Sequence, residues 1–184
     1  LVWQEPDDDT GLGEVYHIVG PTWSFAELLS NSQDVDSRTP DLAISRDGTI
    51  HVAWVEGGAI RVRSGQPASF SSAVTISGVA TDTAGVQIAP DAAGNVFAAW
   101  TEGSARVRAA VRWGGTAVWA APQTVADGLA GLDTIALDAG SDGTVHIAWS
   151  AYPPDDTAGE VYVTTVEFMP PAMNKVYLPL IARR

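Results

Sequence analysis

The stretch SRDGTIHVAW at residues 45–54 decides the fold, because the chain contains it in three versions. The other two are DAAGNVFAAW at 91–100 and GSDGTVHIAW at 140–149. The three versions end in tryptophans at spacings of 46 and 49 residues, and Trp3 lies 51 residues before the first of these tryptophans. Self-similarity at a fixed period is the signature of an architecture built from repeated units. The chain is therefore predicted to consist of units of about 45–50 residues.

Each unit holds the same succession of apolar runs and turns. A short apolar run comes first, and a turn such as Asp47-Gly48 follows, which accepts positive φ at little cost. The next run is apolar at nearly every position, as expected of a strand that is buried on both faces. Two further apolar runs complete the unit. The predicted strands of the two middle units lie at 41–45, 49–54, 59–64, 73–77, 85–90, 95–100, 105–111 and 122–126.

Four antiparallel strands with short connections form one blade of a β-propeller, and the period falls in the range of propeller blades. We therefore predict an all-β fold of about four such blades, the first and last incomplete. The predicted blades lie at 1–37, 38–80, 81–130 and 131–168. A tail at 169–184 follows, in which 175–181 is a candidate edge or closing strand, with Pro179 favouring an edge position.

The two end units show fewer strands than a blade needs. The first unit has predicted strands around Trp3 and at 14–19 and 26–30, and the last at 133–138, 144–149 and 160–166. The count is 14 strands, or 15 with the tail, whereas a closed four-bladed ring needs 16. Either the chain is a piece of a longer propeller, which we prefer, or the tail closes a small ring. Two copies would not complete each other's blades, because a chain that begins at strand two would then end at strand one.

Composition supports the all-β prediction and excludes several classes of partner. Of the 184 residues 46% are hydrophobic, and the net charge is −12. Nucleic acids and anionic membranes require a basic surface, so neither is an expected partner. The absence of cysteine excludes disulfides and thiolate metal sites. No apolar run approaches the length of a membrane helix, so no membrane insertion is expected. An acidic, cysteine-free chain is compatible with an extracellular or cell-surface location.

The units resemble the BNR/Asp-box repeats of sialidase-like propellers. The aspartate turn and the following HVAW-like strand match in the last three units, whereas the loop S-x-D-x-G-x-x-W has lost its aspartate everywhere. The residues that this loop retains are Gly20, Trp23, Ser24, Ser64, Phe70 (in the tryptophan position), Gly115 and Trp119. The resemblance covers residues 1–168 and implies the fold, which hosts many unrelated activities. KVYLPLIARR at the end resembles the terminal tails of secreted proteins in some filamentous phototrophic bacteria.

The resemblance implies sialidase chemistry as a candidate activity. This chemistry requires an arginine cluster, a Tyr–Glu pair and an aspartic acid. The internal arginines lie in pairs on the third strands of two units, and we expect the pairs to be equivalent and to form a polar outer face. These arginines are Arg61, Arg63, Arg106 and Arg108. Glu-x-Tyr occurs in two units, at Glu14 and Glu160, and recurrence is typical of scaffold residues. No catalytic residue is assigned.

The histidines and the recurring aromatics are also predicted to be structural. His51 and His146 occupy one repeat position, which Phe97 fills in the unit between them, so this position is expected to be a packing position. The tryptophans at the repeat period are expected in the core between units. Trp113 and Tyr152 do not recur, and exposed aromatics of this kind can stack on sugar rings. These two residues are our candidate ligand-binding residues.

Two related acidic loops form a candidate calcium site. Their aspartates are Asp7, Asp8, Asp9, Asp155 and Asp156, which supply the hard oxygen ligands that Ca²⁺ prefers. Neither loop has the D-x-[DN]-x-[DN]-G spacing of a calcium loop, and a solvated turn is the alternative. No other cofactor is expected.

The sequence predicts a non-catalytic extracellular or cell-surface module that binds a glycan or a protein, or builds a surface structure. Rigid blades would hold variable loops at the rim, where contacts with a ligand are made. One alternative is a fragment of a glycoside hydrolase whose catalytic residues lie outside this chain. Another is a purely structural subunit that forms oligomers through exposed blade edges.

Overall fold

The computed structural model describes residues 1–21, 23, 26–30, 32, 34–78, 83, 85–152 and 159–170. Within these residues the chain forms fifteen β-strands and no helix, which confirms the all-β prediction. Accordingly, no described helix is long and apolar enough to cross a membrane. The candidate strand at 175–181 lies outside the described residues.

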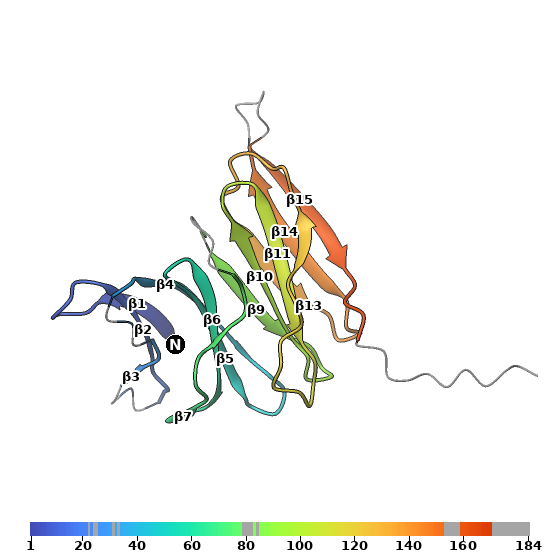
Figure 1. The fold of residues 1–184 in the computed structure, drawn as a ribbon. Helices are drawn as coiled ribbons and strands as arrows, with labels where there is room; N and C mark the ends of the chain where they lie inside the picture. Colours follow the sequence, from blue (N-terminus) through green and yellow to red (C-terminus); the bar gives the residue numbers. More distant parts are fainter. Residues whose placement is uncertain are drawn as a thin grey trace, which may run out of the picture.

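The strands form four antiparallel sheets that follow one another along the chain (Figure 1). Sheet 1 contains β1 (Val2–Pro6), β2 (Gly13–His17) and β3 (Glu27–Leu28). Sheet 2 contains β4 (Ser37–Ile44), β5 (Ile50–Glu56), β6 (Ala59–Gln66) and β7 (Ser69–Phe70), with β8 (Val74–Thr75) also beside β6. Sheet 3 contains β9 (Val86–Pro90), β10 (Val96–Glu102), β11 (Arg106–Arg112) and β12 (Gln123–Ala126). Sheet 4 contains β13 (Ile135–Ala139), β14 (Val145–Ala151) and β15 (Glu160–Val166).

Most predicted strands are confirmed to within a few residues at their ends. The short strand β7 was not predicted, and β4 begins earlier than expected, at Ser37 rather than Asp41. The pairing of β4 with β5 is irregular between Arg38 and Asp41, where Thr39 adopts a left-handed backbone (φ 49). The irregularity lies just before the apolar run DLAIS at 41–45. The sequence pattern therefore predicted only this second half of the strand.

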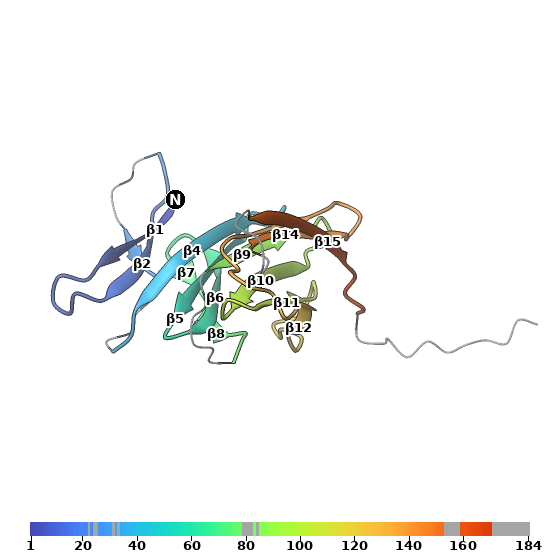
Figure 2. The ribbon, with the colours of Figure 1, turned by 90° about the horizontal axis from the view of Figure 1, so that it is seen from above.

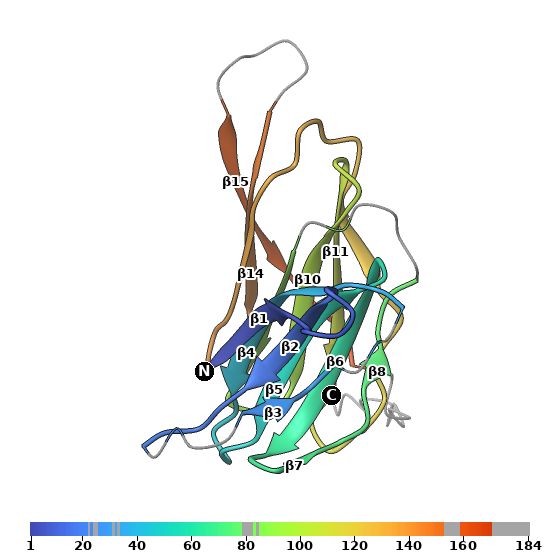
Figure 3. The same ribbon diagram turned by 90° about the vertical axis from the view of Figure 1, so that its left-hand side faces the viewer.

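The sheets lie in a row, and a separate hydrophobic core fills each junction (Figures 1 and 2). Val15 and Trp54 belong to the core between sheets 1 and 2, Ile60 and Trp100 to the core between sheets 2 and 3, and Trp149 to the core between sheets 3 and 4. Viewed from the side of sheet 1, β1 and β2 lie in front of sheet 2 (Figure 3). The recurring tryptophans are therefore confirmed as core residues, except for Trp3, which is only half-buried.

The first strands of adjacent sheets also meet. β4 contacts β9, and β9 contacts β13. Asp41 Oδ2 accepts a hydrogen bond from the Ile88 backbone N–H at 2.8 Å, which joins sheet 2 to sheet 3. Burial raises the pKa of Asp41 above its usual value, while this hydrogen bond opposes the increase.

The central strands β5 and β10 are buried on both faces as predicted, whereas β14 is not. Every residue from Ile50 to Val55 is buried, but His146 in β14 is exposed. The prediction for β14 was wrong because no described sheet covers the far face of sheet 4. Trp23 also differs from its predicted structural role, since its side chain is 56% exposed.

Candidate ligand-binding pocket

A cavity of about 520 Å³ opens between sheets 2 and 3. Three segments line it: the turn between β4 and β5 at 45–49, the turn between β9 and β10 at 91–94, and residues 112–116 after β11. The pocket therefore includes Trp113, one of the two candidate ligand-binding residues.

Two aspartates in the pocket wall hold the turns. Asp91 Oδ1 accepts hydrogen bonds from the backbone N–H groups of Ala93 (2.8 Å) and Asn95 (2.9 Å), and its Oδ2 accepts one from Asn95 Nδ2 (2.6 Å). Asp47 Oδ1 accepts the Thr49 backbone N–H at 3.0 Å, and this bond lowers the pKa of Asp47. Both carboxylates thus serve as turn scaffolds. Recurrence predicted this role for Asp47, whereas Asp91 aligns with Ser45 and Gly140 in the other units and does not recur.

The segment that carries Trp113 is a tight turn. Thr116 donates to the Trp113 carbonyl through its backbone N–H (3.1 Å) and through its hydroxyl (2.8 Å). Gly114 donates its N–H to Asn95 Oδ1 at 2.8 Å, and a Cβ at Gly114 would lie 2.8 Å from the Ala93 carbonyl oxygen. Only glycine allows this close approach. Trp113 is half-buried and packs against the core between sheets 3 and 4, so its ring is held in place rather than freely exposed as predicted.

Arg112 brings a positively charged guanidinium to the pocket. Its side chain is half-buried, and its Nε has no hydrogen-bond partner among the described residues. No described carboxylate forms an ion pair with Arg112. Burial lowers the pKa of the guanidinium, and the nearby charge of Asp47 opposes this effect. The strand pairing shows that Gly65 and Val166 occupy the equivalent positions in sheets 2 and 4, so this arginine does not recur.

His51 lies at the base of the pocket and is fully buried. Its Nε2 is 2.7 Å from the Ser45 hydroxyl and its Nδ1 is 2.8 Å from the Ser64 hydroxyl. Burial first, and the charge of Arg112 second, lower its pKa to about 4. The ring is therefore neutral near pH 7. His51 and Phe97 are both buried, which confirms the predicted packing position in sheets 2 and 3, whereas His146 at this position in sheet 4 is exposed.

The other candidate ligand-binding residue, Tyr152, lies outside the pocket. It follows the end of β14, whereas the pocket lies beside the starts of β5 and β10, at the opposite end of the sheets. Tyr152 is 47% exposed, and its backbone N–H donates to the Ala130 carbonyl at 2.8 Å. The structure therefore does not bring Tyr152 and Trp113 together.

The predicted calcium ligands lie partly outside the described residues, which include neither Asp155 nor Asp156. Asp7 Oδ1 accepts hydrogen bonds from the Asp9 N–H (3.1 Å), the Thr10 N–H (2.9 Å) and the Thr10 hydroxyl (3.0 Å), and the bonds to Thr10 lower its pKa. Asp8 and Asp9 are exposed. In the described part of the chain, no group of three or more His, Cys, Asp or Glu side chains is arranged to hold a metal ion.

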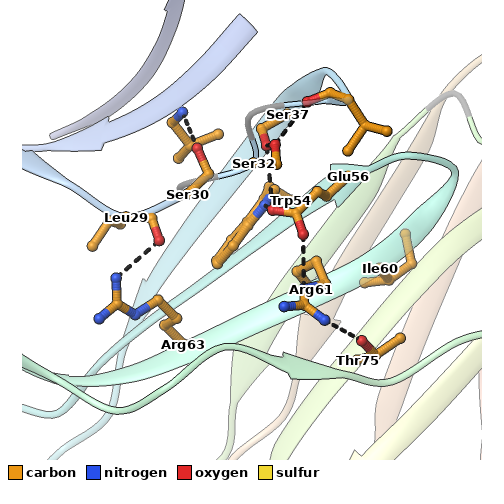
Figure 4. A network of polar contacts seen from close by, with 12 residues as sticks. Leu29, Ser30, Ser32, Ser37, Trp54, Glu56, Ile60, Arg61, Arg63 and Thr75 are labelled. Carbon is orange, nitrogen blue, oxygen red and sulfur yellow. Dashed lines mark hydrogen bonds and ion pairs between the residues drawn. The ribbon is translucent and has the colours of Figure 1, made fainter.

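The arginine pairs are engaged in bonds within the chain. Arg61 and Arg63 line a smaller cavity of about 210 Å³. Figure 4 shows their polar contacts. Arg61 Nε lies 3.1 Å from Glu56 Oε1, and Arg61 also bonds the Thr75 hydroxyl. Arg63 donates to the carbonyls of Leu29 (2.9 Å) and Ser71 (2.7 Å).

The second arginine pair is not equivalent to the first in the way the sequence indicated. Trp54 pairs with Arg61 and Trp100 pairs with Arg108, so Arg61 corresponds to Arg108 and not to Arg106. The prediction was wrong because the turn between β10 and β11 is one residue longer than the turn between β5 and β6. Arg106 and Arg108 both contact Glu102, at 3.0 and 3.5 Å.

Comparisons with known proteins give the fold without a function. No family model matches the sequence, and no curated protein matches it. A solved structure of a protein of unknown function from Dyadobacter fermentans is similar with a TM-score of 0.63 and 8% identity, over 89% of this chain and 49% of that one. This chain thus spans about half the length of that protein. An endo-arabinase from Bacteroides thetaiotaomicron has a TM-score of 0.48 and 13% identity, over 86% of this chain and 66% of that one, which is too low a similarity to support an argument.

Proposed function

We propose that this chain is a non-catalytic binding module, built of consecutive β-propeller blades, that binds a glycan in the pocket at Trp113. The propeller is supported by the repeat period, by the row of antiparallel sheets and by the contacts between their first strands. An extracellular or cell-surface location is part of the proposal and fits the acidic, cysteine-free composition.

One observation carries the proposal: the pocket gathers side chains that do not recur. Trp113 lines it as a half-buried aromatic residue whose ring also packs on the core between sheets 3 and 4, and Arg112 adds a guanidinium whose Nε has no hydrogen-bond partner among the described residues. Asp47 and Asp91 are used by their own turns. A sugar ring can stack its apolar face on an indole, and its hydroxyl or carboxylate groups can accept hydrogen bonds from a guanidinium. The engagement of Asp47 and Asp91 in turn hydrogen bonds favours binding without catalysis.

The test is a glycan array with the complete chain, followed by titration of the bound glycan. We expect the Trp113→Ala variant to bind about tenfold more weakly or worse, because an aromatic contact contributes on the order of 1.4 kcal/mol. Arg112→Gln, which keeps most of the side-chain volume, serves as a second variant in case the loss of Trp113 disturbs the core. Tyr152→Ala is the control and should bind as the wild type does.

Two results would contradict the proposal. If no glycan binds, or if both pocket variants bind as tightly as the wild type, the pocket is not a glycan site. If the chain releases products from the bound glycan, the module is an enzyme, as the glycoside hydrolase alternative predicts.

A further inference from the structure

The outer face of sheet 4 carries exposed apolar side chains, and no described sheet covers it. We use this name for the side chains of His146, Ala148, Ser150, Val161, Val163 and Thr165, which alternate with the residues that pack on sheet 3. Val161 is 75% exposed and Val163 is 70% exposed. Adjacent exposed valines on a regular strand are unusual for a solvated surface and typical of an interaction site.

The repeat shows what normally covers this face. Strand pairing aligns Val161 with Val107 in sheet 3 and with Ile60 in sheet 2, each one residue before the partner of the core tryptophan. Val107 and Ile60 are both 0% exposed, because the next sheet packs on them. The position is therefore a sheet–sheet packing position, and it is exposed in sheet 4 only because no described sheet follows.

The opposite end of the row has the complementary face. Trp3 and Tyr16 stack in sheet 1 with ring centroids 5.7 Å apart and an interplanar angle of 20°. Trp149 and Tyr162 stack in the same way in sheet 4, at 5.8 Å and 13°, where both rings belong to the core against sheet 3.

No described sheet covers the pair in sheet 1 in this way. Val15, which neighbours Tyr16, lies in the core against sheet 2, so strand alternation directs Trp3 and Tyr16 to the other face. Trp3 is half-buried, and Leu28, which pairs with Tyr16, is 40% exposed. Figure 1 shows the two uncovered sheets at opposite ends of the row.

We propose that two copies of this chain bind each other head to tail, with Trp3 and Tyr16 of each copy packed on Val161 and Val163 of the other. Such a contact repeats the junction that sheet 4 already makes with sheet 3, where Trp149 and Tyr162 lie against the face of Val107. The outer face of sheet 4 therefore fits a face that carries a stacked tryptophan and tyrosine. The same chain has such a face in sheet 1, at the other end of the row.

Two head-to-tail contacts between two copies close on themselves, so that no uncovered face remains. The resulting ring has twice the four sheets of one chain, which is within the usual range of propellers. The contact joins faces and requires no exchange of strands, so it does not depend on completing the blades at either end.

The first test is the mass in solution, measured by light scattering after size-exclusion chromatography over a range of concentrations. We expect about twice the 19.3 kDa of one chain. The variant Val161→Arg with Val163→Arg should be a monomer, because it places two charges in the contact. Val118→Arg is the matched control, since Val118 is a valine of similar exposure (74%) in a loop, and it should remain a dimer.

The second test distinguishes head-to-tail contacts from symmetric ones. Trp3→Arg should also be a monomer alone, yet a mixture of this variant with the double valine variant should form a dimer through the one intact contact. A symmetric contact through either face would leave one of the variants dimeric by itself. A monomeric wild type at every concentration, or a dimer in either variant alone, would overturn the proposal.

A folding control accompanies these tests. All three variants should keep the circular dichroism spectrum of the wild type, and Val161 and Val163 are exposed enough for arginine to be tolerated in the monomer. The glycan pocket lies between sheets 2 and 3 of a single chain, so the monomeric variants should keep their glycan affinity. Failure of dimerisation and failure of glycan binding are therefore separate results.

Discussion

His51 is a fully buried histidine whose ring nitrogens are both fixed by serine hydroxyls. Its pKa falls from 6.5 to about 4 on folding. The unfolded chain therefore binds a proton that the folded chain does not, and stability is lost as the pH falls from about 6.5 towards 4. A difference of this size corresponds to about 3 kcal/mol of unfolding free energy. We expect His51→Phe, which copies Phe97 at the same repeat position, to remove this part of the pH dependence.

The measurement is urea unfolding at a series of pH values between 7 and 4. All three proteins carry Val161→Arg and Val163→Arg so that they are monomers, and His146→Phe is the matched substitution because His146 is exposed at the equivalent position of the single chain. Carboxylates also titrate in this pH range, but they contribute equally to the pH dependence of unfolding in all three proteins. Parallel curves for the wild type and His51→Phe would show that His51 is not the buried neutral histidine described above.

Glu56 occupies the centre of the network in Figure 4. Its carboxylate accepts hydrogen bonds from Trp54 Nε1 (3.1 Å) and the Ser37 hydroxyl (3.3 Å), and it pairs with Arg61. Replacing Glu56 with alanine leaves a buried indole N–H and a largely buried guanidinium without their partner. We expect the free energy of unfolding to fall by about 1–3 kcal/mol.

Glu102 is the matched comparison for this prediction, because it lies at the same repeat position in sheet 3. It pairs with Arg106 at 3.0 Å and with Arg108 at 3.5 Å, whose side chains are 39% and 23% exposed, and partly exposed ion pairs contribute at most about 1 kcal/mol each. Unlike Glu56, it accepts no hydrogen bond from the core tryptophan, since Trp100 Nε1 has no hydrogen-bond partner among the described residues. Denaturant unfolding of Glu56→Ala and Glu102→Ala should therefore differ. Equal losses in the two variants would mean that the hydrogen bonds of Glu56 add nothing to its ion pair.

At the scale of elements, the β6–β7 hairpin depends on a glycine. A Cβ at Gly65 would lie 2.6 Å from the Phe70 Cα, in the backbone of the partner strand. Gly65→Ala should therefore force the strands apart and reduce the free energy of unfolding by about 1–3 kcal/mol. A Cβ at Gly78 meets nothing within 4 Å, so Gly78→Ala should leave stability nearly unchanged in the same denaturation experiment. An intact β7 in Gly65→Ala, seen by hydrogen exchange, would contradict this expectation.

The strands could be predicted from the sequence because each unit combines an apolar run with a turn that allows positive φ. Gly48, Gly94 and Gly143 adopt φ angles of 84°, 83° and 84°, as the repeated turns predicted. The strand β7 was missed because its two residues carry no apolar alternation. The arginine equivalence was wrong because a one-residue difference in a turn changes the register without changing the apolar pattern.

The candidate pocket was predictable in one of its parts only. Trp113 was predicted because it has no counterpart in the other units. Arg112 also has no counterpart, but it lies at the end of an apolar strand and was not predicted. The contribution of the turn at 45–49 was not predictable, because it depends on the distance between two sheets. Tyr152 shows the limit of the criterion, since a residue can be unique and still lie away from the pocket.

At the scale of the whole molecule, stability should vary along the row of sheets. Each core joins only two neighbouring sheets, so within the described part of the chain sheets 2 and 3 are covered on both faces and sheets 1 and 4 on one face each. In arrays of this kind the units in the interior are held by two interfaces and the end units by one. Local opening is easiest where the fewest buried contacts must be broken.

Hydrogen exchange measures this difference directly. In the monomeric variant with Val161→Arg and Val163→Arg, amides of β5 and β10 should exchange most slowly, and those of β2 and β15 should exchange first. In the wild type, the head-to-tail contact covers the outer face of sheet 4 and the Trp3 face of sheet 1, so exchange in β2 and β15 should slow down while β5 and β10 change little. If amide hydrogen exchange were equally slow in all four sheets of both proteins, the prediction would be wrong. The four sheets would then unfold as a single cooperative unit, and covering the end sheets would not slow their exchange.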